Sequence, residues 1–161
     1  MRKFEIISEE QWAKDISVLD SPKCDIIDHL KPHRSTKYSA GYDFISPIEI
    51  IIPAHGMAKI PTGIKAQMNE DEVLYIYSRS SIGFKTAIRL SNVVGVVDCD
   101  YYNNLDNEGH IFIKFFNPTD KDYQIHIGDK IAQGIFTKYL TVDDEEEIET
   151  ERSGGLGSTG K

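Results

Sequence analysis

Short apolar or alternating runs dominate the chain after Pro32, and each run has the length of a β-strand. They are rich in Ile, Val, Tyr and Phe, which fit a pleated surface. Clusters of Pro, Gly, Asn and Asp separate them, as expected for turns. The runs cover residues 48–52, 57–66, 73–77, 88–90, 93–97, 111–116, 123–127 and 131–139. Many short strands at this spacing predict an all-β fold, with a sandwich, a jelly roll or a barrel as the alternatives.

Two local patterns add detail to this outline. Phe4–Ile7 is compatible with a short strand, and Ser8-Glu-Glu-Gln11 is a capping box that predicts a short helix over residues 9–18. The run 57–66 contains a proline and a glycine, which are rare inside a central strand. We therefore predict a sheet edge or a bend within that run.

The 161 residues carry a formal net charge of −8 that is unevenly distributed. Residues 143–161 hold seven acids and two cations, a net charge of −5, which leaves −3 on residues 1–142. We predict one β-domain over residues 1–142, with an N-terminal elaboration at 9–38. Residues 143–161 are predicted to form an acidic linker followed by a flexible glycine-rich arm.

Composition also limits the compartment and the partners. Cys24 and Cys99 lie far apart without metal-ligand spacing, which favours a reducing compartment. The N-terminal sequence lacks the apolar segment of a secretion signal, and no apolar run approaches membrane-spanning length. We predict a soluble cytoplasmic protein with no membrane partner. The chain has no Lys/Arg-rich stripe, so we expect no polymeric nucleic acid as a partner.

Five polar clusters carry the candidate chemistry. They lie at residues 39–43, 77–83, 92–101, 128–133 and 151–161. Together they supply hydroxyls and an arginine for anions, carboxylates at a strand end, an aromatic platform, an amide and closely approachable backbone N–H groups. This combination predicts a nucleoside triphosphate as substrate and a carboxylate that activates water.

The order and spacing of these clusters resemble the five motifs of the trimeric dUTP pyrophosphatases, or dUTPases. The matching segments, from the first motif to the fifth, are Ala40–Asp43, Ser78–Ser81, Gly95–Tyr101, Gly128–Gln133 and Arg152–Gly160. The resemblance implies a distorted jelly roll or β-barrel of the dUTPase type. It also implies hydrolysis of dUTP to dUMP and pyrophosphate, which limits uracil in DNA and supplies dUMP for dTMP synthesis.

The resemblance further implies catalytic roles for two residues. Asp98 matches the carboxylate that activates the attacking water, and Arg79 matches the arginine that supports it. Tyr101 matches the ring packed under the deoxyribose, where it would crowd a 2′-hydroxyl. The groups that would read uracil are the side chain of Asn92 and backbone groups of Gly95 and Val97.

The remaining implied contacts are to the phosphates and the metal. Ser80, Ser81 and Gln133 match phosphate contacts, and Asp43 lies near the metal–triphosphate region without being a direct ligand. The cofactor implied is Mg²⁺, held mainly by the triphosphate and water. The arm would close over the nucleotide through Arg152, Leu156, Gly157, Ser158 and Thr159. The resemblance also implies a homotrimer in which each site draws on more than one subunit.

Three positions depart from the family pattern. Leu156 stands where a phenylalanine usually covers the base, and Phe84 and Phe112 are candidate replacements. Asn103 replaces a glycine, and asparagine tolerates the left-handed backbone better than most residues. The hairpin at residues 105–110 is longer than usual, which is compatible with a local elaboration or a partner surface.

Three rival functions belong to other classes. A dCTP deaminase would share the fold, the Arg-Ser-Ser element and Gly109-His110, but Lys114 stands where that family needs a glutamate. A non-catalytic nucleotide sensor that grips a regulatory protein partner is the second rival, and the set of expected catalytic residues argues against it. A purely structural jelly roll is the third, and it does not explain the order of the motifs.

Overall fold

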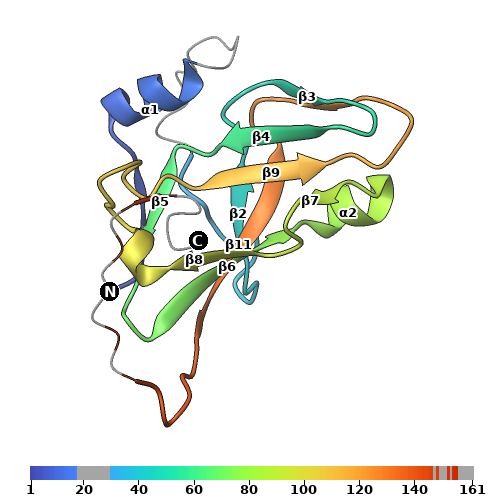
Figure 1. Cartoon of the computed structure of the whole chain (residues 1–161). Helices are drawn as coiled ribbons and strands as arrows, with labels where there is room; N and C mark the ends of the chain where they lie inside the picture. Colours follow the sequence, from blue (N-terminus) through green and yellow to red (C-terminus); the bar gives the residue numbers. More distant parts are fainter. Residues whose placement is uncertain (18–29, 147, 149–151, 153, 156–161) are drawn as a thin grey trace.

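The structure, a computed structural model, describes residues 1–17, 30–146, 148, 152 and 154–155, and most of its regular elements are strands (Figure 1). The strands are β1 (Lys3–Ile6), β2 (Tyr42–Ile45), β3 (Ile50–Ile52), β4 (Met57–Pro61), β5 (Ile64–Gln67), β6 (Glu72–Ser78), β7 (Arg89–Leu90), β8 (Gly95–Asp98), β9 (Phe112–Phe116), β10 (Tyr123–Ile125) and β11 (Lys130–Lys138). Between them lie two short helices, α1 (Glu9–Ile16) and α2 (Ser80–Thr86), and the 3-10 turn η2 (Cys99–Tyr101).

The described strands form four antiparallel sheets. The largest has the order β2-β11-β6-β8, and a second has the order β4-β9-β7. Two further pairs, β1-β5 and β3-β10, complete the arrangement. The described strands do not close into a barrel, and the fold is jelly-roll-like. The predicted all-β class is confirmed.

One hydrophobic core joins the inner faces of these sheets. In β9 the sequence Phe-Ile-Lys-Phe-Phe alternates, so Ile113 and Phe115 are buried while Lys114 is exposed. They meet Phe44 of β2 and Leu74 of β6, which have no exposed surface. Each such side chain stabilises the fold by about 1.5–3 kcal/mol through burial. The alternation therefore determines which side chains of a strand point into the core and which remain accessible to solvent or a ligand.

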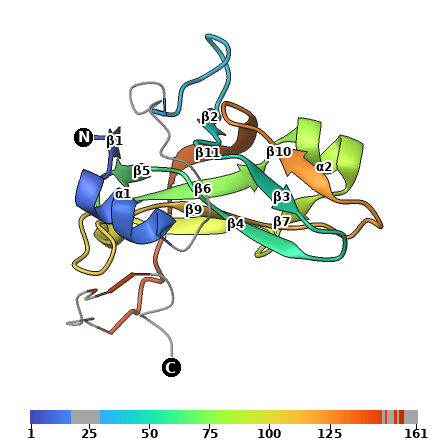
Figure 2. The same cartoon turned by 90° about the horizontal axis from the view of Figure 1, so that it is seen from above.

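The two helices lie at opposite ends of the sheets (Figures 1 and 2). The predicted helix cap is confirmed, because the Ser8 hydroxyl accepts a hydrogen bond from the backbone N–H of Gln11 at 3.1 Å. The predicted end of this helix at residue 18 lies outside the described residues. Helix α2 was not predicted, since its seven residues include a glycine and bury only Ile82. No helix in the described part is long and apolar enough to span a membrane.

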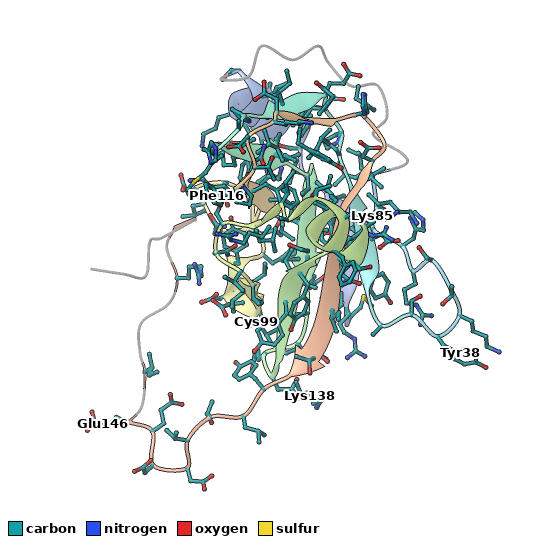
Figure 3. All side chains as sticks on the ribbon, turned by 90° about the vertical axis from the view of Figure 1, so that its right-hand side faces the viewer. Tyr38, Lys85, Cys99, Phe116, Lys138 and Glu146 are labelled. Carbon is teal, nitrogen blue, oxygen red and sulfur yellow. The ribbon has the colours of Figure 1, made fainter. Side chains whose placement is uncertain are left out.

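Two other local expectations can be followed in the structure. The bend predicted within residues 57–66 is confirmed: β4 ends at Pro61 and β5 begins at Ile64, with Gly63 between them at a φ of 72°. After β11 the chain leaves the sheets, and residues 139–146 run away from the body as far as Glu146 (Figures 1 and 3). Their side chains are exposed, and Leu140 is 97% exposed. The boundary of the domain at residue 142 stays a prediction.

Candidate active site

A cavity of about 250 Å³ opens between β8 and β9. All four residues of β8 line it, together with residues 111–114, Asn92, Tyr101 and Arg152. Four consecutive strand residues can border one cavity only along a strand edge, because successive side chains point to opposite faces. β8 is the outer strand of its sheet among the described residues and leaves one edge unpaired. Its backbone N–H and C=O groups are therefore available to a planar ligand.

The turn that presents Asn92 has a strained backbone. Val93 has a φ of 65°, a left-handed conformation that a β-branched residue rarely adopts. The turn is closed by a 2.7 Å hydrogen bond from the N–H of Val94 to the carbonyl of Asn92. Asn92 is exposed at the border of the cavity. Such strain persists only where the surrounding structure imposes it, and it often marks a functional position.

At the far end of β8 one arginine bridges two carboxylates. Arg152 donates from Nε to Asp100 Oδ1 and from Nη2 to Asp98 Oδ2, both at 2.8 Å. The carboxylate side chains are half exposed, 52% for Asp98 and 51% for Asp100, while that of Arg152 is 10% exposed. Ion pairs this exposed to solvent contribute only about 0–1 kcal/mol each. The arginine can therefore be drawn away by a stronger anion.

Tyr101 forms the floor of this end of the cavity. Its ring lies 5.6 Å from the guanidinium carbon of Arg152. The hydroxyl donates to the carbonyl of His110 at 2.9 Å and accepts from Nδ2 of Asn107 at 2.8 Å. Burial raises the pKa of Tyr101 above its ordinary value, which keeps the hydroxyl protonated and able to donate.

A second polar cluster surrounds Asp43 of β2. Its carboxylate accepts hydrogen bonds from Ser35 Oγ at 2.5 Å and Lys130 Nζ at 2.9 Å, and Arg79 Nη1 lies 3.0 Å away. Burial alone would raise the pKa of Asp43, but the bonds from Ser35 and Lys130 and the charge of Arg79 lower it below the ordinary value. Asp43 is thus a permanent anion that fixes two cations.

The other residues expected to contact phosphate lie near this second cluster. Gln133 faces Asp43 across the β11–β2 ladder, and its Nε2 lies 3.4 Å from the carbonyl of Ser78. A Cβ on Gly41 would lie 2.6 Å from Oε1 of Gln133, so the glycine of the first motif leaves room for this glutamine side chain. Ser80 and Ser81 are exposed at the start of α2.

Arg79 is held by the Asp43 carboxylate. Its Nη1 is buried and lies 3.0 Å from Oδ1 of Asp43, although within the described residues this contact lacks the alignment of a hydrogen bond. A guanidinium has five N–H donors, so Arg79 can pair with Asp43 and still offer other donors to an anion.

The two clusters lie at opposite ends of β6. In the β6–β8 ladder Asp98 is opposite Val73, whereas Arg79 follows the last residue of β6, six residues further along. A strand rises about 3.3 Å per residue, so the backbones at these two positions are about 20 Å apart along the strand direction. Within one chain the structure brings Asp98, Tyr101 and Arg152 together but does not bring Arg79 to them.

Comparison with known proteins identifies the family. A family model described as dUTPase matches residues 29–160. The chain belongs to the dUTPase family. The family expected from the five motifs is confirmed, and with it the prediction of a hydrolase that acts on a nucleoside triphosphate.

Individual relatives agree with this assignment. The chain is 51% identical over 131 residues to the deoxyuridine 5′-triphosphate nucleotidohydrolase of Lactococcus lactis, which covers 80% of this chain and 87% of the relative. It is 37% identical over 134 residues to the enzyme of the same name from Arabidopsis thaliana, over 80% and 75% of the two chains. The crystal structure of dUTPase from Streptococcus mutans superposes with a TM-score of 0.71 at 38% identity, covering 88% and 98%.

The positions that depart from the dUTPase pattern have separate outcomes. Phe112 lines the cavity, with Lys59 Nζ 4.5 Å from its ring centroid, whereas Phe84 is 93% exposed on α2 and does not line the cavity. Asn103 has the left-handed φ of 57° that the replaced glycine predicts. Lys114, the residue that speaks against a deaminase in the sequence, also lines the cavity. Residues 156–159 lie outside the described residues.

Two contacts of this site were missed by sequence reasoning. Asp100 shares Arg152 with Asp98, and Lys130 holds Asp43. Asp100 and Lys130 both lie inside the motifs quoted above, so their position in a motif could have marked them as site residues. Their partners Arg152 and Asp43, however, are 52 and 87 residues away in sequence, and spacing within a motif does not reveal partners at that separation.

Proposed function

We propose that this chain hydrolyses dUTP to dUMP and pyrophosphate with Asp98 as the general base. The observation that carries the proposal is the half-exposed Asp98 carboxylate at the mouth of a cavity walled by Asn92, the β8 edge and Tyr101. A base must be within reach of water and next to the nucleotide. The exposure of this carboxylate and its place in the lining of the cavity support that role. In the cell the reaction would limit uracil in DNA and supply dUMP for dTMP synthesis.

The proposed chemical step is a single displacement at phosphorus. Asp98 accepts a proton from a water molecule while the water oxygen forms a bond to the α-phosphorus. The bond from that phosphorus to the oxygen bridging the α- and β-phosphates breaks, and its electron pair leaves with pyrophosphate. Holding water and phosphorus in this geometry supplies much of the rate enhancement.

The cavity supports selection of base and sugar. A pyrimidine ring beside β8 would find the backbone groups of Gly95 and Val97 and the amide of Asn92. The ring of Tyr101 would lie under the deoxyribose and leave no space for a 2′-hydroxyl. Aromatic contact of this kind is rigid and depends strongly on shape.

Phosphate binding is assigned to both polar clusters. Arg152 would exchange its two carboxylates for phosphate oxygens, which a guanidinium binds in a bidentate manner. The other N–H donors of Arg79, with Ser80, Ser81 and Gln133 of a neighbouring subunit, would bind the same triphosphate from the other side. The arm residues Leu156, Gly157, Ser158 and Thr159 are proposed to enclose the nucleotide and exclude water.

The donor set argues against a magnesium site built by this chain alone. Among the described residues no three His, Cys, Asp or Glu side chains converge on a point, and Asp43 is already engaged with two cations and a hydroxyl. We therefore propose that Mg²⁺ arrives as part of the substrate, bound by the triphosphate and water. When bound it neutralises phosphate charge.

We also propose that the active enzyme is a homotrimer with shared sites. Asp98 and Arg79 are about 20 Å apart along one chain, and a triphosphate nucleotide cannot bridge them while the phosphorus stays beside Asp98. A neighbouring subunit could present its Arg79 cluster to the Asp98 cavity. Light scattering coupled to size exclusion tests this, with about three times the 18.2 kDa chain mass expected.

One assay decides the reaction. Pyrophosphate and ammonia release are measured side by side with dUTP, UTP, dTTP and dCTP, each with Mg²⁺. We expect pyrophosphate from dUTP at least about a hundredfold faster than from UTP, because a shaped site must reject one added hydroxyl. Ammonia from dCTP would favour the deaminase alternative, and equal rates with all four nucleotides would exclude a dUTP-specific enzyme.

A further inference from the structure

The hairpin after η2 is a buried polar network. Asn104 and Asn107 are each only 8% exposed, in a loop where asparagine is usually solvated. Figures 1 and 2 show this loop, in yellow, packed beside α1. A loop that buries amides must satisfy each of their polar atoms, so it holds one conformation.

Asn107 lies at the centre of this network. Its Oδ1 accepts from Asn104 Nδ2 at 2.8 Å and from the N–H of Gly109 at 3.1 Å, and its Nδ2 donates to the hydroxyl of Tyr101 at 2.8 Å. These bonds fix the orientation of the amide. The donor that faces Tyr101 is therefore pre-positioned, and the loop holds it there.

The hydroxyl of Tyr101 is held from two sides. It accepts from Asn107 and donates to the carbonyl of His110 at 2.9 Å. The ring is thus anchored at its backbone end and at its far end, and it cannot swing out of the cavity. Rejection of one extra hydroxyl on a sugar is steric, so it needs a wall that does not yield.

The loop is itself anchored to the N-terminal helix. The His110 ring is fully buried, and its Nε2 accepts from the N–H of Gly63 at 2.9 Å. Its Nδ1 therefore carries the proton and donates to Asp15 of α1 at 2.6 Å. Glu108 accepts from the N–H of Ser8 at 3.1 Å. Through these contacts the N-terminal elaboration supports the loop.

The C-terminal arm meets the same loop. A Cβ built on Gly155 would lie 2.7 Å from Oδ2 of Asp106 and 3.1 Å from Nδ2 of Asn107. Gly155 of the arm therefore lies next to the loop that holds Tyr101.

We propose that Asn107 is a positioning residue that holds the Tyr101 ring against the sugar. The loop at residues 103–110 then sets the selectivity of the site for deoxyribose over ribose. This inference rests on the proposed dUTP hydrolysis and assigns a role to the lengthened hairpin.

The test compares Asn107→Ala, Tyr101→Phe and their double variant. We measure kcat/KM for dUTP and UTP, and binding of the α,β-imido analogues of both nucleotides by calorimetry. Loss of one tether is expected to lower the dUTP-over-UTP ratio of kcat/KM about three- to tenfold, mainly through a rise in kcat/KM for UTP, because a ring that can move admits the extra hydroxyl. Tyr101→Phe removes the bonds to both Asn107 and His110. The double variant should therefore be no more impaired in selectivity than Tyr101→Phe alone, because the bond that Asn107→Ala cuts is already absent.

Leu105→Ala is the matched control, since this residue of the same loop is 95% exposed. It should keep the wild-type ratio. Fluorescence of Trp12, the single tryptophan, checks the packing of α1 in each variant, because its ring centroid lies 6.2 Å from that of His110.

Two results would overturn the proposal: a folded Asn107→Ala protein with wild-type selectivity, or fully additive losses in the double variant. If Asn107→Ala does not fold, Tyr101→Phe alone tests the proposal. An unchanged dUTP-over-UTP ratio in that variant would show that the hydrogen bonds of the Tyr101 hydroxyl do not set selectivity. A wild-type protein inactive on dUTP contradicts the proposed function, and the imido analogues then still compare deoxyribose and ribose binding across the variants.

Discussion

Asp98 and Asp43 are both strand carboxylates that pair with arginine, yet their surroundings differ. The Asp43 side chain is 7% exposed and has three partners, whereas that of Asp98 is 52% exposed and has one. Removing one charge from a buried cluster leaves the opposite charges buried without a partner. In an exposed pair, water or a ligand can replace the lost partner. The comparison separates a buried carboxylate that fixes structure from an exposed one that is accessible to water and ligands.

The largest expected effect comes from Asp98→Asn. The amide keeps the shape of the side chain but cannot accept the proton from water, so kcat for dUTP should fall by about 10²–10⁴-fold. Binding of the α,β-imido analogue should stay within a few-fold of wild type. Asp100→Asn is the matched control, because it loses an equivalent bond to Arg152 but leaves the base in place. Equal losses in both variants would reject Asp98 as the base.

Deletion of residues 152–161 removes the partner of the exposed carboxylates and leaves the Asp43 cluster intact. We expect kcat/KM for dUTP to fall by about 10–100-fold, since a bidentate phosphate contact and the closing arm are lost. The melting temperature without nucleotide should change by less than about 2 °C, because ion pairs this exposed add little stability. A large drop in melting temperature would mean that the arm also supports the fold.

Asp43→Asn should act mainly on stability. Lys130 and Arg79 lose the charge that fixes them, and we expect the free energy of unfolding to fall by about 2 kcal/mol. Urea unfolding at neutral pH measures this. Ser35→Ala removes a neutral partner of the same carboxylate and should cost less. If Asp43→Asn is no more costly than Asp98→Asn, the contrast between the two carboxylates is wrong.

The smallest expected effect is the pH dependence of the difference in unfolding free energy between wild type and Asp43→Asn. The pKa of Asp43 is lowered in the folded protein, so at acidic pH this carboxyl group binds fewer protons in the folded protein than in the unfolded chain. The stability that ionised Asp43 adds is fully present when the pH is above the ordinary pKa of an aspartate. It is lost as the pH falls through the lower pKa that Asp43 has in the folded protein. The gap between wild type and Asp43→Asn in urea should therefore be constant from pH 7 to about 5 and shrink below about 3.8. A gap that shrinks near pH 6 would implicate another group.

Most strands and turns could be predicted from local sequence patterns, and the element that could not be predicted has a physical explanation. Alternation in residues 111–116 and the capping box at Ser8 depend on neighbours within a few residues, so they could be predicted. Helix α2 could not, because seven residues with one buried side chain carry no helical period. Its position is set by packing at the end of the sheets.

By itself the sequence determined the class of the fold, the order of the five motifs and the identity of the carboxylate that ends β8. Only the tertiary structure decided which of these residues meet. Pairing of β6 with β8 put Asp98 and Arg79 at opposite ends of the ladder between these two strands, and the hairpin at 103–110 brought Asn107 to Tyr101. Strand register and loop packing depend on contacts between residues distant in sequence, which local patterns do not encode.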